Sequence, residues 1–146
     1  MRFVEKNNGK AHNTTFLGNA RVKGPFVDAR GTVDLETAGA GTLTAAGIAA
    51  GWIVRDCAGG NRADTTATAA LIIEAMALEE DDRFSWILEN ASDAAETSTV
   101  YGGTGVTITD GSDGNDIAVA QFYRCRFECM VTGAATIDMT PFLSAA

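Results

Sequence analysis

The residue types that most often carry catalysis are scarce in this chain. Its only histidine, His12, lies among turn-forming residues, with no serine or cysteine nucleophile and no acid at a suitable spacing nearby. A catalytic triad needs a nucleophile beside a base that a third group orients. We therefore expect no catalytic residues and no enzymatic activity.

Cysteines and an acidic loop are the possible metal ligands. Cys125 and Cys129 occupy one face of a predicted strand, roughly 13 Å apart, which is too far for a disulfide. Without other histidines, a zinc site would need all three cysteines. Their separation in the sequence and their place on a core face favour small buried thiols instead. The loop "DGSDGND" (110–116) lacks EF-hand spacing, and Asp and Gly are also usual hairpin residues. We expect no metal and no cofactor, with calcium at Asp110, Asp113 and Asp116 as the alternative.

Charge divides the chain into two parts. Residues 1–30 carry six basic side chains against two acids, whereas residues 31–146 carry five arginines against seventeen acids. We read this as a basic N-terminal arm, 1–30, attached to an acidic β-rich body, 31–146. An acidic body does not suit nucleic acid, because phosphates need cations facing them.

The arm is irregular in pattern yet contains isolated large apolar residues. A solvated linker would not need them, so we expect the arm to pack on its own body or to order against a neighbouring subunit. Phenylalanines and lysines are scattered along it, and the candidate contacts are Phe3, Lys6, Lys10, Phe16, Lys23 and Phe26.

The body reads mainly as strands. "RFSWILEN" alternates, with Phe84, Trp86 and Leu88 on one face, and "WIVRDC", "TSTVYG" and "TGVTIT" are shorter strands. We expect an antiparallel β-sandwich or open barrel. One helix, about 67–78, begins after an N-cap at 64–66, and it must be covered on most sides because it is apolar almost all round.

The longest predicted strand, 117–132, has two distinct faces. One face carries Tyr123, Cys125, Phe127 and Cys129 and is expected in the core. The other mixes apolar and charged side chains, as subunit interfaces do. Its candidate interface residues are Phe122, Arg124, Arg126 and Met130.

Several segments together resemble a known family. They are "AGAGTLTAAGI" (38–48), "GWIVRD" (51–56), "NRADTTATAALI" (61–72), "FSWILENAS" (84–92) and "GGTGVTI" (102–108). The body, from about Gly31 to Leu143, resembles the head decoration (cement) proteins of tailed bacteriophages and related fibre-like domains. It departs from them at Ala67, where the family usually has proline, and at "EEDDR".

The resemblance implies a non-enzymatic virion protein. Such a protein is made in the host cytoplasm, forms a homotrimer and binds the major capsid protein on the outer surface of the capsid. The alternative is a phage fibre domain that binds a receptor or glycan, for which exposed loop aromatics such as Tyr101 would argue. No apolar run has the length of a membrane span, so no membrane partner is expected.

Overall fold

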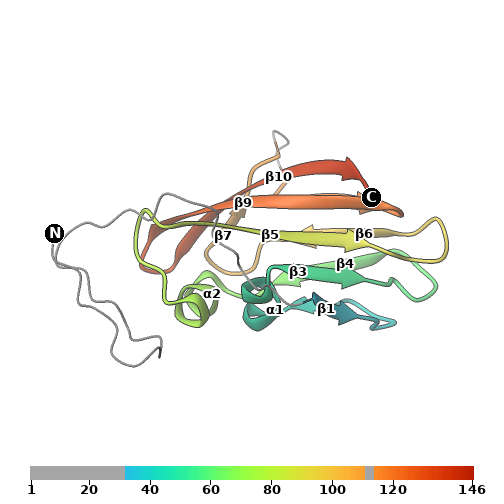
Figure 1. The fold of residues 1–146 in the computed structure, drawn as a ribbon, viewed down its shortest axis with the longest axis horizontal. Helices are drawn as coiled ribbons and strands as arrows, with labels where there is room; N and C mark the ends of the chain where they lie inside the picture. Colours follow the sequence, from blue (N-terminus) through green and yellow to red (C-terminus); the bar gives the residue numbers. More distant parts are fainter. Residues whose placement is uncertain (1–31, 111–113) are drawn as a thin grey trace, which may run out of the picture.

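The computed structural model describes residues 32–110 and 114–146, which form two β-sheets and two short helices (Figure 1). Along the chain the elements are β1 (Thr32–Leu35), β2 (Thr42–Leu43), α1 (Ala45–Ala50), β3 (Trp52–Arg55), β4 (Arg62–Thr66), α2 (Ala69–Met76), β5 (Arg83–Asn90), β6 (Thr97–Tyr101), β7 (Val106–Ile108), β8 (Asp116–Ala120), β9 (Tyr123–Gly133) and β10 (Thr136–Ala145). The expectation of a mainly β fold is confirmed. The predicted arm, 1–30, lies outside the described residues.

The sheets are mixed, which corrects the expectation of antiparallel ones. The larger sheet has the order β1-β3-β5-β9-β10-β7 and the smaller one the order β2-β4-β6-β8. Three successive pairs of strands, β1–β2, β3–β4 and β5–β6, each step from the larger sheet to the smaller one. After β2 and after β4 the chain returns to the larger sheet. As a result β1, β3 and β5 are parallel neighbours in the larger sheet, and β2, β4 and β6 are parallel neighbours in the smaller one.

Two helices are present where the sequence predicted one. Each begins after a threonine that accepts a backbone N–H bond, from Gly47 to Thr44 and from Leu71 to Thr68. The expected N-cap at 64–66 is wrong, because those residues belong to β4. The six residues of α1 are alanine, glycine and one isoleucine, too short a run to show an amphipathic period.

Helix α2 is only partly covered, which corrects the expectation of a buried helix. Ala69 and Ile72 face the core. Leu71 is 53% exposed, and Ala75 on the same side is also exposed. The helix lies beside α1, at the end of the larger sheet where β3 and β5 begin (Figure 1). An apolar helical face is therefore open among the described residues.

The predicted strand 117–132 is two strands in different sheets. β8 pairs with β6 in the smaller sheet, and β9 pairs with β5 in the larger one. Phe122, in the turn between them, has a positive φ of 61°. Val119 before this turn and Cys125 after it are both buried, but Tyr123, which the sequence placed on the core face, is 43% exposed, so the expectation for Tyr123 is wrong.

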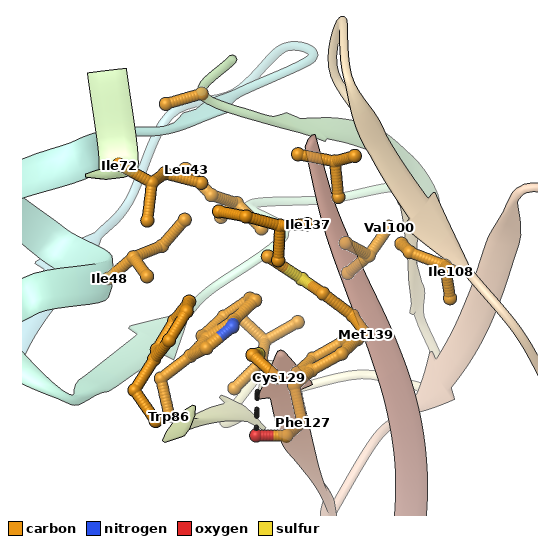
Figure 2. Close-up of a cluster of buried hydrophobic side chains, with 14 of the residues drawn as sticks. Leu43, Ile48, Ile72, Trp86, Val100, Ile108, Phe127, Cys129, Ile137 and Met139 are labelled. Atoms are coloured by element: carbon orange, nitrogen blue, oxygen red, sulfur yellow. Dashed lines mark hydrogen bonds between the residues drawn. The ribbon is translucent and has the colours of Figure 1, made fainter. Parts of the chain in front are cut away.

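The core between the sheets is apolar at the end near the helices. Trp86 and Phe127 are cross-strand partners whose rings stack, with centroids 4.3 Å apart and planes 7° apart (Figure 2). Met139 and Ile137 of β10 pack in the same cluster, and Ile48 and Ile72 bring the helices into it. The face predicted for Phe84, Trp86 and Leu88 is confirmed as buried.

The opposite end of the core is polar and contains a buried ion pair. Arg55 and Asp64 are both 0% exposed and form an ion pair at 2.9 Å between β3 and β4. Arg55 also donates to the carbonyl groups of Leu35, Thr37 and Gly39. This pair joins the two sheets where β1 and β3 end.

Candidate interface on the six-stranded sheet

The outer face of the larger sheet carries the predicted body contacts. The alternation of β9 points Arg124, Arg126 and Met130 outward, opposite the buried Cys125, as predicted. Phe122 lies in the turn before the strand and is 62% exposed. The described structure therefore brings all four residues to the outside, three on the sheet face and one at its end.

Neighbouring strands complete this face. Arg126 lies between Ile87 of β5 and Phe142 of β10, and Arg124 lies between Glu89 and Ser144. Sequence reasoning missed Ile87 and Phe142, because only the strand register places them beside the arginines.

Both arginines are held over aromatic rings. The guanidinium carbon of Arg124 lies 5.1 Å from the ring centroid of Trp52, and its Nε is 3.0 Å from Glu89 Oε2. Arg126 lies 5.8 Å from the Phe142 ring and pairs with Glu128 at 3.0 Å. Such contacts orient the two guanidinium groups, each of which also has a carboxylate partner, at a modest gain each where solvent reaches them.

A shallow hollow of about 320 Å³ opens on this face. Ile87, Arg124, Arg126 and Phe142 line it, together with Leu143 and Ser144 at the end of β10. The lining joins apolar surface to two cations and offers no nucleophile beside a base. It can receive an aromatic or acidic side chain from a partner.

The edge of the sheet beside the hollow is open. β7 pairs with β10 only over Ile137–Met139, so Thr140–Ala145 has β9 on one side and no strand on the other among the described residues. Phe142 is 50% exposed and Leu143 49% exposed along this edge. Edges of this kind accept an added strand, although Pro141 lacks an N–H to donate.

The outer face of the smaller sheet is different. Its outward residues are mostly small and uncharged, among them Ala63, Thr65, Thr99, Ala118 and Ala120, and Asp116 is a charged exception. Tyr101, at the end of β6, is the large exception at 42% exposed. Large and charged side chains thus gather on one of the two outer faces.

The three cysteines are free and buried, as the sequence predicted. Burial raises the pKa of Cys125 and of Cys129 to about 12. Both therefore stay protonated near neutral pH, where a nucleophile or metal ligand would have to be a thiolate.

Several predicted residues lie outside the described part of the chain. They are Asp113 of the acidic loop, His12, and the arm contacts Phe3, Lys6, Lys10, Phe16, Lys23 and Phe26. Asp110 and Asp116, which flank the undescribed 111–113, are described.

Comparisons with known proteins were made by family, by sequence and by fold. No family model, no curated protein and no solved structure matches this chain. In the described residues, no helix is both long and apolar enough to cross a membrane.

Proposed function

We propose that this protein is a non-enzymatic virion protein, a decoration (cement) protein that binds the outside of a major capsid shell and bridges neighbouring capsomers. The observation that carries the proposal is the outer face of the larger sheet, which no other element of the described part of the chain covers and where Arg124 and Arg126 lie over aromatic rings. Arginine and aromatic side chains are the residues enriched where protein surfaces meet. The family resemblance of the body supports the capsid as the partner.

The arm supplies a second contact in this proposal. Its positive charge and its anchors Phe3, Phe16 and Phe26 suit binding to the capsid or to the acidic body of a neighbouring copy. Burying one phenylalanine is worth about 1.5–3 kcal/mol, whereas an exposed ion pair is worth at most about 1 kcal/mol. The apolar anchors therefore dominate, and the lysines contribute mainly at low salt.

A homotrimer is part of the same proposal. The open side of α2, with Leu71 at 53% exposed, is apolar surface that a second copy can cover. Sedimentation equilibrium at micromolar concentration should give three times the 15.2 kDa mass of the chain, and Leu71→Glu should lower it. A monomer at that concentration would contradict an intrinsic trimer.

Cosedimentation with capsids built from the cognate major capsid protein tests the proposal directly. The double variant R126A/F142A should weaken binding at least about tenfold, because central aromatic and arginine contacts carry most interface energy. Tyr101→Ala is the matched control, since Tyr101 is a similarly exposed aromatic on the other sheet. Unchanged binding of R126A/F142A would reject this face as the capsid contact.

Deleting residues 1–30 separates the arm from the body. The truncated protein should remain folded and no longer bind capsids, and replacing the six basic residues should weaken binding mainly at low salt. Full occupancy by the truncated protein would place the whole attachment on the β body.

A phage fibre domain that binds a receptor or glycan is the second candidate. Exposed aromatic rings favour it, because a ring offers an apolar plane to a sugar, and Tyr101 and Tyr123 are 42% and 43% exposed. In that case Tyr101→Ala should abolish binding to a glycan array while R126A/F142A leaves it intact, the reverse of the capsid result.

A further inference from the structure

Three carboxylates from two separate loops meet at the polar end of the larger sheet. Asp56 follows β3 directly, while Asp93 and Glu96 lie in the loop between β5 and β6. Both loops leave the sheet at the same edge, because β3 and β5 are parallel with Arg55 opposite Asn90. One carboxylate oxygen from each acid lies within 4.8 Å of the other two.

Glu96 is the unusual member of this carboxylate cluster. Its residue is only 6% exposed, and its Oε2 is buried with no hydrogen-bond partner in the described structure. Burying a carboxylate without a partner is costly, and two further acids beside it add repulsion. The arrangement calls for a positive charge at the point where the oxygens converge.

The side chains of the two nearby arginines, Arg55 and Arg62, bond to groups other than these three carboxylates. Arg62 donates to the carbonyl groups of Cys57 and Ala58, at 2.6 and 3.0 Å. The side chain of Arg55 bonds to the Asp64 carboxylate and to backbone carbonyls, one of them that of Asp56. Within residues 32–110 and 114–146, no ion pair involves any of the three acids.

Buried hydrogen bonds hold the two loops in place. Asn90 donates through Nδ2 to the carbonyl of Glu96 at 2.9 Å and accepts through Oδ1 from Ser92. Ser92 Oγ in turn accepts from the Cys57 N–H at 2.9 Å, which ties the Asp56 loop to the Glu96 loop. A supporting shell of this kind positions ligands before an ion arrives.

We propose that Asp56, Asp93 and Glu96 bind one calcium ion, which links the β3–β4 loop to the β5–β6 loop. All three ligands are hard oxygens, which suit Ca²⁺ and Mg²⁺ better than zinc or copper. Calcium binds oxygen at about 2.4 Å, so ligands across its sphere are about 4.8 Å apart, the spacing within which these oxygens already lie. Magnesium, at about 2.1 Å, demands near-ideal octahedral geometry and gives up its waters reluctantly, so a cluster of protein carboxylates suits it less well. This proposal is independent of any role on a capsid.

Titration of the full-length, chelator-treated protein tests the proposal. Isothermal calorimetry with CaCl₂ should show one ion bound per chain. At a CaCl₂ concentration of 10 mM, near one hundred times Kd, the melting temperature should rise by about 5–10 °C. MgCl₂ at the same concentration should give a smaller rise. Glu96→Gln and Asp93→Asn should each remove most of the response.

The variants separate ion binding from folding. Without calcium, Glu96→Gln should melt at or above the chelated wild type, because the substitution removes repulsion. If Glu96→Gln does not fold, Asp93→Asn decides the question, since Asp93 is exposed. Glu80→Gln, at an exposed acid of the α2–β5 loop, is the control and should keep the full response. No heat and no rise in wild type, or a full response in Asp93→Asn, would overturn the site.

Discussion

Replacing Asp64 with alanine should be among the most damaging single changes in the body. Each carboxylate oxygen accepts two bonds. Oδ2 accepts from Arg55 Nε at 2.9 Å and Ser98 Oγ at 2.7 Å, and Oδ1 accepts from Arg55 Nη2 at 3.0 Å and Gly41 N at 2.7 Å. These bonds connect β3, β4, β6 and the loop before β2. The alanine variant would leave the Arg55 cation buried without its counter-charge.

The expected loss follows from that burial. Removing one partner of a buried ion pair costs about 3–5 kcal/mol, and the unpaired Gly41 and Ser98 donors add to it. Domains have a total stability of about 5–15 kcal/mol, so Asp64→Ala should remove a large share of it. Urea unfolding followed by tryptophan fluorescence should show a fall of at least about 3 kcal/mol, or a chain already unfolded in buffer.

Two comparisons make this test specific to burial. Glu128→Ala breaks the Arg126–Glu128 pair, which has a similar separation of 3.0 Å but side chains 57% and 47% exposed, and it should cost under about 1 kcal/mol. The double variant R55M/D64L should be more stable than Asp64→Ala, because no charge is left buried. A loss below about 1 kcal/mol for Asp64→Ala would refute the reasoning.

Two further predictions concern buried thiols and a tight turn. Since burial raises the pKa of Cys125 and Cys129 to about 12 from 9.0, the unfolded chain loses protons above pH 9 that the folded chain keeps. The free energy of unfolding should therefore fall as the pH rises from about 9 towards 12, by at most about 1.4 kcal/mol per pH unit for each thiol. Urea unfolding at several pH values measures this dependence, and alanine at either cysteine should make it less steep. Gly105→Ala should destabilise strongly, because φ is +78° and a Cβ would collide with the Ala135 carbonyl oxygen. Gly59→Ala, at φ +86° in open space, should cost only about 1 kcal/mol in thermal melts, and equal losses at the two glycines would contradict the steric account.

Local alternation was enough to predict several strands and their faces. Phe84, Trp86 and Leu88 repeat every second residue, and a strand places such residues on one side. The same rule placed Arg124 and Arg126 outside and Cys125 inside. These assignments depend only on backbone geometry within one segment, so no knowledge of partners was needed.

Short and uniform segments did not reveal their structure. β2 has two residues and α1 has six, mostly alanine, so neither contains a full period of apolar and polar residues. The turn at Phe122 was hidden for a different reason. Val119 of β8 and Cys125 of β9 are buried in the same core an even number of residues apart, so the sequence pattern fits one strand although Tyr123 between them is exposed.

Tertiary structure alone decided which distant side chains meet. Strand alternation says which face a residue occupies but not which strand lies beside it, so Phe142 could not be placed next to Arg126 from the sequence. Asp56 is likewise far along the chain from Asp93 and Glu96. They converge because β3 and β5 pair in parallel and in register. The two strands therefore end side by side, and the loops that follow them leave the sheet at the same end. Pairing of this kind is set by the packing of the whole sandwich, since only the complete core selects one register among those that local sequence allows.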